Sequence, residues 1–175
     1  MDLLNKILTE IPEIKDQEKL LEETLKENDF LSKQHIKIVA WASSIVTKDT
    51  EIVSYIKEKV GELNKEEKRT VFIASSRMSV TNPYFMGRNV HPVNAGGTID
   101  SLGFQPFQSL KITDELAYHY ACIAFSIING GYMCFNSHMT SLKNLGQDPK
   151  AIDQALRLSV AISAIRQGIF NSTFL

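Results

Sequence analysis

Apolar residues recur along most of this chain at spacings of three and four, which is the pattern of helices with one buried face. No segment shows convincingly the alternation of apolar and polar residues that is typical of a half-buried strand. We therefore expect an all-α fold built as a helical bundle. The pattern predicts helices over residues 3–11, 17–28, 33–46, 50–63, 65–80, 114–128, 132–145 and 149–168.

Residues that favour helix ends stand at the boundaries of these segments. Short polar side chains accept hydrogen bonds from the unpaired N–H groups of a first turn, and glycine readily closes a last turn. Asn64 with Glu67 has the spacing of a capping box, with Asn in place of the usual Ser or Thr. The other predicted end residues are Ser32, Asp49, Thr113, Gly146 and Asp148, the last followed by Pro149 at the first helical position.

The helical pattern fails from about residue 82 to residue 113, where prolines and glycines are frequent. This stretch predicts a long loop, and a long loop in a compact domain usually has a function or covers a core or a subunit interface. The segments on either side, 33–80 and 114–168, repeat the order of buried helix, break, amphipathic helix and further capped helix. This weak echo is compatible with an internal duplication of helical hairpins.

Size and charge narrow the range of function classes. With 175 residues and a formal net charge of −1, the chain has the size of one domain, residues 1–175, and lacks the basic excess that nucleic acids or anionic membranes require. No apolar run is long enough to cross a bilayer, and residues 1–11 lack the features of a signal peptide. We therefore expect a cytoplasmic protein without nucleic-acid or membrane partners.

The most reactive residues of the chain follow a glycine break. After Asn129-Gly130-Gly131, Cys134 falls in the first turn of the next predicted helix, and His138 lies one turn further on the same face. Proximity to a helix N-terminus and to an imidazole lowers the pKa of a thiol. Cys134 is thus a candidate nucleophile and His138 its base or partner. Without such neighbours, a buried helical cysteine is more often an inert apolar residue.

Other residues affect this interpretation. His119 lies on the predicted helix that leads into the break. If the two helices fold back on each other, His119 approaches His138. It then orients the His138 imidazole as the third member of a proton relay. A metal site is the main competitor, but it needs at least one more ligand, for which His119 or His91 are the candidates. We expect no metal and no cofactor. Cys122 has apolar neighbours and is expected in the core, out of disulfide reach of Cys134.

The residues around the break resemble a known motif. The segment from Phe125 to His138 is similar to the pattern Ser-Ala-Ile-Asn-Gly-Cys, two variable residues, Cys, three variable residues and His of the alkyl hydroperoxide reductase AhpD group, within the carboxymuconolactone decarboxylase-like superfamily. Upstream, the segment from Asn82 to Arg88 resembles that family's Asn-x-Phe-Tyr-x-Gly-Arg stretch. Length and helix order also fit the family over the whole chain.

The resemblance implies an all-α subunit, usually a homotrimer, that reduces alkyl hydroperoxides as a thiol-dependent antioxidant. It implies partnership with the peroxiredoxin AhpC and electrons from a lipoyl-bearing protein. In that family the second cysteine of C-x-x-C attacks the peroxide, the first resolves the sulfenic acid to a disulfide, and a glutamate and the histidine relay protons. By position, Cys134 matches the attacking cysteine and His138 the relay histidine.

Two positions depart from that motif: Gly131 replaces the resolving cysteine, and His119 stands where the relay glutamate is expected. Without a second thiol in the motif, a Cys134 sulfenic acid requires an external thiol for its reduction. The sequence leaves three hypotheses open. They are a one-cysteine peroxidase, a scaffold that kept the fold and oligomer but lost redox turnover, and a decarboxylase-like enzyme that uses His119 and His138 as acid and base.

Overall fold

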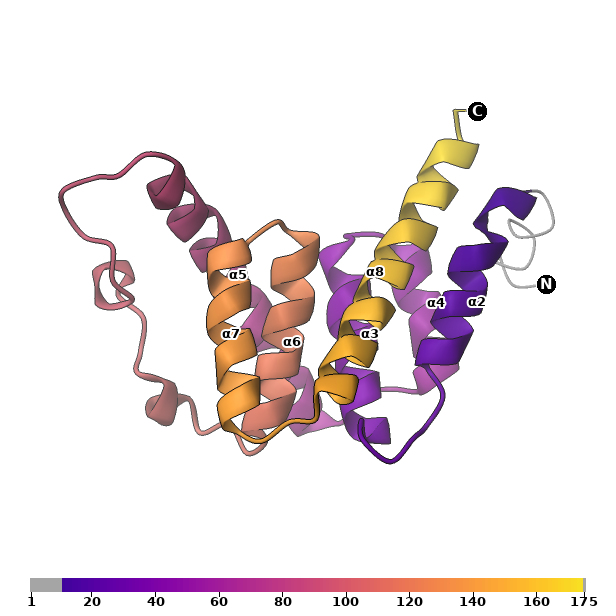
Figure 1. Ribbon diagram of the computed structural model, residues 1–175, viewed down its shortest axis with the longest axis horizontal. Helices are drawn as coiled ribbons and strands as arrows, with labels where there is room; N and C mark the ends of the chain where they lie inside the picture. The colour runs from indigo at the N-terminus through magenta and orange to yellow at the C-terminus, as the bar shows by residue number, and fades with distance from the viewer. Residues whose placement is uncertain (1–10, 175) are drawn as a thin grey trace.

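The computed structural model describes residues 11–174, and every regular element within them is a helix (Figure 1), which confirms the predicted all-α fold. The predicted helix over residues 3–11 falls almost entirely outside the described residues. None of the described helices combines the length and the apolar character needed to span a membrane. The elements are η1 (Pro12–Ile14), α2 (Lys15–Thr24), α3 (Lys33–Val46), α4 (Thr50–Val60), α5 (Lys65–Val90), η2 (Asp100–Leu102), η3 (Phe107–Leu110), α6 (Glu115–Ile128), α7 (Tyr132–Asn144) and α8 (Pro149–Ser172), where η marks a short 3₁₀ helix.

Most of the predicted helix ends are confirmed by hydrogen bonds. Ser32 accepts one from the first turn of α3, and Asn64 and Glu67 form a reciprocal capping box at the start of α5. The prediction of Thr113 as a cap is wrong, because Asp114 accepts the bond from the first turn of α6. A carboxylate also places negative charge at the positive end of the helix dipole. Asp49, Gly146 and Asp148 stand at helix ends as predicted.

Helix α6 occupies the centre of the bundle and is buried on most of its faces. It contacts α3, α5, α7 and α8, and the small side chains of Ala117, Ala121 and Ala124 let these neighbours approach closely. A buried hydrogen bond of 3.0 Å between Ser43 and Ser159 joins α3 to α8. Helix α5 packs on α6 as α8 packs on α3. The last helix of each repeated segment thus packs on the first helix of the other segment, and the internal duplication itself stays a prediction.

The predicted loop over residues 82–113 is too long, because α5 continues through Pro83 to Val90. A proline inside a helix removes one backbone hydrogen bond, and this loss normally ends or kinks the helix. Here tertiary contacts hold the adjoining turn, since Asn82 is buried and accepts a hydrogen bond of 3.0 Å from the Ser126 hydroxyl on α6. Packing against α6 therefore overrides the local preference of the sequence.

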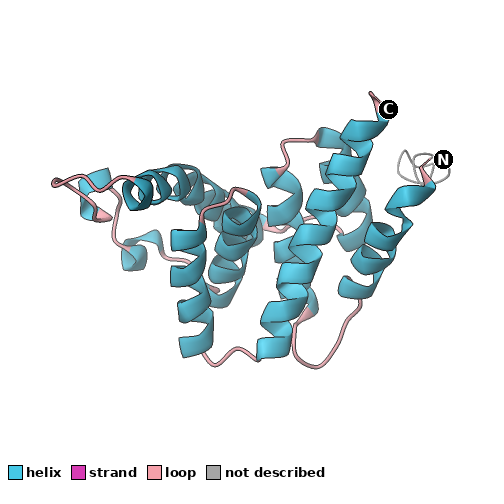
Figure 2. Ribbon diagram, turned by 45° about the horizontal axis from the view of Figure 1, so that its top comes forward, coloured by secondary structure: helices cyan, strands magenta, loops and turns pink. Residues whose placement is uncertain are grey.

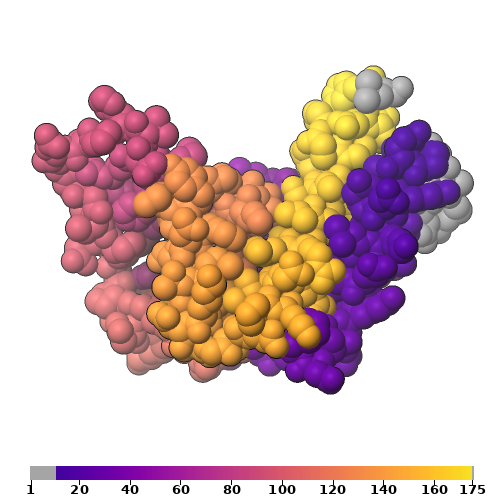
Figure 3. Space-filling view, in the orientation of Figure 1, coloured from indigo at the N-terminus to yellow at the C-terminus, as the bar shows by residue number. Residues whose placement is uncertain are grey.

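The remaining connection, residues 91–114, forms a lobe beside α5 and α7 at one end of the molecule, whereas α2 and α8 lie at the other end (Figures 1–3). It contains little regular structure, so its carbonyl groups need partners from elsewhere. Arginine side chains along α5 donate to these carbonyls and hold the connection against the helix. The donors, each followed by its acceptors, are Arg69 (Leu110, Lys111), Arg77 (Gln105) and Arg88 (Val93, Ala95).

Candidate active site

The glycine break turns the chain back on itself between α6 and α7. Gly130 adopts a left-handed conformation with a φ of 70°, which is strained for a residue with a Cβ atom. The N–H of Gly131 donates to the Ser126 carbonyl at 2.8 Å, and α7 begins at Tyr132. Helices α6 and α7 consequently lie side by side (Figure 1), so residues before the break face residues after it.

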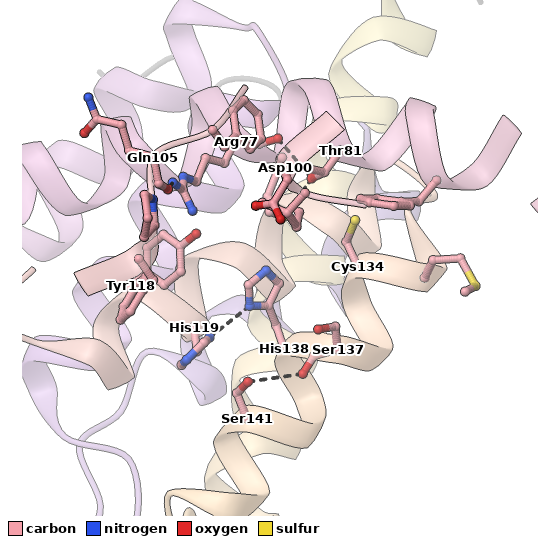
Figure 4. Close-up of a pocket in the computed structure, with 17 residues that line it drawn as sticks. Arg77, Thr81, Asp100, Gln105, Tyr118, His119, Cys134, Ser137, His138 and Ser141 are labelled. Atoms are coloured by element: carbon pink, nitrogen blue, oxygen red, sulfur yellow. Dashed lines mark hydrogen bonds between the residues drawn. The ribbon is translucent and has the colours of Figure 1, made fainter. Parts of the chain in front are cut away.

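A cavity of about 530 Å³ lies between α5, α6, α7 and the connection 91–114. Figure 4 shows Cys134 and His138 on α7, with His119 and Tyr118 beside them on α6 and Arg77 across from them on α5. An apolar wall with a few convergent polar groups is typical of sites for small molecules. The apolar side chains that line this cavity are Met78, Phe85, Ile99, Phe104, Pro106, Phe107 and Met133.

The structure confirms the predicted approach of His119 to His138. Their Nδ1 atoms are 2.9 Å apart, which is the distance of a hydrogen bond with one proton between them. Tyr118 packs edge-on against both imidazole rings, and Phe107 from the connection stacks on His119 at 6.1 Å between ring centroids. Aromatic rings therefore fix the orientation of the pair.

Glu115 favours one distribution of protons over the pair. Its carboxylate lies 3.5 Å from Nε2 of His119, and an acceptor there favours a proton on this nitrogen. Nδ1 of a neutral His119 then carries a lone pair, to which His138 donates from its own Nδ1. The Nε2 atom of His138 is left with a lone pair, and Figure 4 shows this nitrogen on the side of the ring that faces the cavity.

Both imidazoles are neutral at physiological pH. Burial, with smaller contributions from His119 and Arg77, lowers the pKa of His138 to about 3. Burial also lowers the pKa of His119, although the Glu115 carboxylate opposes this change. A neutral imidazole accepts a proton rather than pairing as a cation with a thiolate. The His138 imidazole that lines the cavity is therefore uncharged.

The expected lowering of the Cys134 pKa is not found. The residue is 7% exposed, and burial raises the pKa of its thiol, which a hydrogen bond with Thr81 only partly offsets. Among the described residues, no hydrogen bond joins Cys134 to His138, whose Nδ1 atom is bonded to His119 instead. The prediction is wrong because burial removes the hydration that a thiolate requires. Cys134 is a neutral thiol that needs a base when it reacts.

This environment predicts the pH dependence of thiol modification. Only the thiolate is alkylated, so its rate rises about tenfold per pH unit below the thiol pKa. Because the pKa of Cys134 is raised, we expect the iodoacetamide rate to keep rising from pH 7 to pH 9 without a plateau. Intact mass measured against time gives the rate, and Cys134→Ser gives the background from Cys122. A plateau below pH 8 contradicts the raised pKa.

Gly131, at the position of the resolving cysteine in the motif, has no room for a side chain. A Cβ atom there would lie 2.2 Å from Cγ of Asn82, which is 2% exposed and held by Ser126. The φ of Gly131 is −82°, a value that any residue adopts. Space, rather than backbone conformation, therefore requires glycine here. Asn82 occupies the volume that a second thiol would need.

The other candidate residues lie outside the cavity. Cys122 is fully buried in the core, as predicted, and burial raises its pKa. Cys122 and Cys134 are both free thiols. His91 is exposed after the end of α5 and does not line the cavity. Within residues 11–174, no group of three His, Cys, Asp or Glu side chains is placed to hold a metal ion.

Three members of the site were missed by sequence reasoning. Glu115 had a usable signal, because it precedes His119 by four residues and so shares its helix face. Arg77 and Tyr118 had none. The sequence pattern presents Tyr118 as one more apolar residue of a buried helix, and Arg77 as one charge on a solvated face of α5. Only the packing of α5 and α6 brings them to the cavity.

The chain is similar to several proteins named alkyl hydroperoxide reductase AhpD. The chain is 31% identical over 111 residues to the alkyl hydroperoxide reductase AhpD of Caulobacter vibrioides, a match that covers 59% of this chain and 56% of that protein. It is 24% identical over 165 residues to the AhpD of Mycobacteroides abscessus, covering 91% of each chain, and 26% identical over 137 residues to that of Mycolicibacterium paratuberculosis, covering 75% and 74%. No protein-family model matches the chain.

These similarities support an AhpD-like protein. The match to the Caulobacter protein spans little more than half of that relative's length, whereas the match to the Mycobacteroides protein spans nearly all of it at lower identity. The helical fold of residues 11–174 agrees with this grouping. The names of these relatives give a family-level indication of antioxidant function.

Proposed function

We propose that this protein reduces organic hydroperoxides at Cys134 by a one-cysteine mechanism, as a member of the AhpD group. The observation that carries the proposal is the placement of a single thiol and a hydrogen-bonded histidine pair in one cavity. The names of the similar proteins supply the reaction class. In this proposal Cys134 is the nucleophile, His138 the base and His119 the second member of the relay.

The thiol proton leaves through the histidine pair. Nε2 of His138 accepts it, while the Nδ1 proton of His138 passes to Nδ1 of His119. The positive charge then lies on His119, next to the Glu115 carboxylate 3.5 Å away. His138 acting alone, with a pKa of about 3, is a weak base for a buried thiol. Moving the positive charge to His119, beside the Glu115 carboxylate, lowers the free-energy cost of taking up the thiol proton.

Reduction of the peroxide then follows within the cavity. The Cys134 thiolate attacks the terminal oxygen of ROOH, the S–O bond forms and the O–O bond breaks. The departing alkoxide takes the proton back from the relay and leaves as ROH. The product is a Cys134 sulfenic acid, so sulfur has been oxidised by two electrons and the peroxide reduced by two.

The sulfenic acid requires thiols from outside the site, because Gly131 supplies none. One external thiol attacks the Cys134 sulfur, forms a mixed disulfide and releases water, and a second displaces Cys134 as a thiol. A small thiol, or a dithiol such as that of a lipoyl-bearing protein, has the required chemistry. A peroxiredoxin of the AhpC type as partner and a homotrimer as assembly are further parts of this proposal, taken from the family resemblance.

Intact mass after peroxide treatment tests the mechanism. We expect cumene hydroperoxide to add one oxygen atom to the wild-type protein, and dithiothreitol to remove it. Cys134→Ser should show no such adduct, which excludes Cys122 and the methionines as the reversible site. An adduct that forms equally in Cys134→Ser contradicts the mechanism. A Cys134 that stays unmodified at excess peroxide points to a scaffold without redox turnover.

A second candidate function uses the histidine pair alone. The raised pKa of Cys134 and the neutral, hydrogen-bonded histidines favour acid–base chemistry as in a carboxymuconolactone decarboxylase-like enzyme. In that case turnover of a lactone substrate survives Cys134→Ser and is lost with His119→Phe or His138→Gln. Under the peroxidase proposal, Cys134→Ser abolishes hydroperoxide turnover.

A further inference from the structure

The cavity contains one cationic side chain whose charge has no carboxylate partner among the described residues. Arg77 is half-buried and is the only Lys or Arg among the described residues that line the cavity. No carboxylate within residues 11–174 lies at ion-pair distance from its guanidinium. Asp100 also lines the cavity, but it is exposed and forms no ion pair with any described residue. A partly desolvated charge without a counterion is costly, so the site favours an anionic ligand.

Neighbouring groups hold the guanidinium in place without using all of its donors. Arg77 donates to the backbone carbonyl of Gln105, and the ring of Phe104 lies 5.2 Å from the guanidinium carbon. In Figure 4 the guanidinium lies between Gln105 and Tyr118, on the far side of the cavity from Cys134. A planar guanidinium has further N–H groups in a fork that matches the two oxygens of a carboxylate.

The position of Arg77 relative to Cys134 limits the size of the ligand. The Thr81 hydroxyl donates to the carbonyl of Arg77 one helical turn away, and it also contacts the Cys134 thiol. The backbone of Arg77 thus lies one turn of α5 from the residue that contacts Cys134, and both side chains line the same cavity of about 530 Å³, which has room for a short carbon chain. The same cavity is also lined by the apolar side chains of Met78, Phe104 and Met133.

From this geometry we infer that the cavity binds short-chain carboxylates, with the carboxylate on Arg77, the chain against the apolar wall and the reactive end at Cys134. The inference rests on the proposed function for the identity of that reactive end. A hydroperoxide that bears a carboxylate and a thiol that bears one share this chemistry. Either is expected to react faster than its uncharged counterpart, and comparing the two shows which one the arginine selects.

Binding of an unreactive acid tests the inference without any turnover. We expect hexanoate to bind wild-type protein at least about tenfold more tightly than Arg77→Gln in calorimetric titrations, because a charge-assisted hydrogen-bond pair is lost. Arg77→Lys should fall between them. The matched control is Arg157→Gln, which removes an exposed arginine paired with Asp153 outside the cavity. Asp100→Asn should bind hexanoate at least as tightly as wild type.

A structural role for Arg77 has a different signature. If the side chain only supports the connection 91–114, Arg77→Gln weakens hexanoate and 1-hexanol equally, or weakens neither, and either result overturns the inference. Loss of hexanoate alone supports it. The kinetic arm compares a hydroperoxy acid with its methyl ester, and 3-mercaptopropionate with 2-mercaptoethanol. We expect the charged member of at least one pair to lose about tenfold more kcat/KM in Arg77→Gln than its neutral analogue.

The two proposals fail separately. Hexanoate binding that depends on Arg77 in a protein with an inert Cys134 supports the carboxylate site and contradicts the peroxidase. Peroxide reduction without any preference for a carboxylate supports the peroxidase and overturns the carboxylate site.

Discussion

Lowering the pH from 7 to 4 is expected to cost the wild-type protein roughly 3 kcal/mol more free energy of unfolding than it costs the His138→Gln variant. The folded protein holds His138 neutral down to a pKa of about 3, whereas the unfolded chain binds a proton at the ordinary value of 6.5. Below pH 6.5 the unfolded state therefore binds more protons than the folded state. The stability that His138 contributes is present above pH 6.5 and is lost as the pH falls toward 3.

Urea denaturation at half-unit intervals between pH 7 and pH 4 measures this difference. The matched control is His91→Gln, which removes an exposed histidine that does not line the cavity and should keep the wild-type slope. The two cavity histidines share one hydrogen bond, so His119→Phe should flatten the same part of the curve. Parallel pH profiles for wild type and His138→Gln would show that the pair is not held neutral by the fold.

Replacing Gly131 by cysteine is expected to destabilise the protein by about 2–3 kcal/mol rather than to restore a working dithiol. The new Cβ atom would overlap Cγ of Asn82, and Asn82 is held by Ser126 on α6. Trimming that side chain should relieve the clash, so the Gly131→Cys, Asn82→Ala double variant is expected to be more stable than the sum of the single changes predicts. A double-mutant cycle by urea denaturation measures the coupling.

Gly87→Cys is the control for the effect of a new cysteine on a helix, because no atom lies within 4 Å of a Cβ built at Gly87. It should change stability by less than about 0.5 kcal/mol. Once the space is cleared in the double variant, the introduced thiol stands three residues before Cys134, and we expect mild oxidation to join the two sulfurs and to lower the mass by a pair of hydrogen atoms. Equal stabilities of Gly131→Cys and Gly87→Cys would contradict the steric account of the missing thiol.

Helix positions were predictable because their signals are local. The capping box of Asn64 and Glu67 and the glycine break at residues 130–131 involve groups within a few residues of each other, and the structure places both as expected. The end of α5 was not predictable, because Pro83 argues locally for a break. Packing of Asn82 on α6 decides the outcome there, and residues 82 and 126 have no detectable link in the sequence.

The site was predictable where helical spacing alone relates its members. Cys134 and His138 share a face of α7 by their separation, and the break between α6 and α7 made the approach of His119 foreseeable. The pKa of Cys134 was not foreseeable in this way. Helical spacing places Cys134 near a helix end and an imidazole, but it does not reveal how much water the neighbouring elements remove, and burial raises the pKa of the thiol.

The sequence by itself determined that this protein is all-α, where most of its helices lie, and that one thiol and one imidazole share a helix face after a glycine break. These properties follow from periodicity and short-range hydrogen bonds. Only the tertiary structure decided that the thiol is neutral, that Asn82 fills the place of a resolving cysteine, and that Arg77 faces the cavity with no described carboxylate at ion-pair distance. Those properties depend on desolvation, volume and charge contributed by α5, which is distant in sequence and adjacent in space.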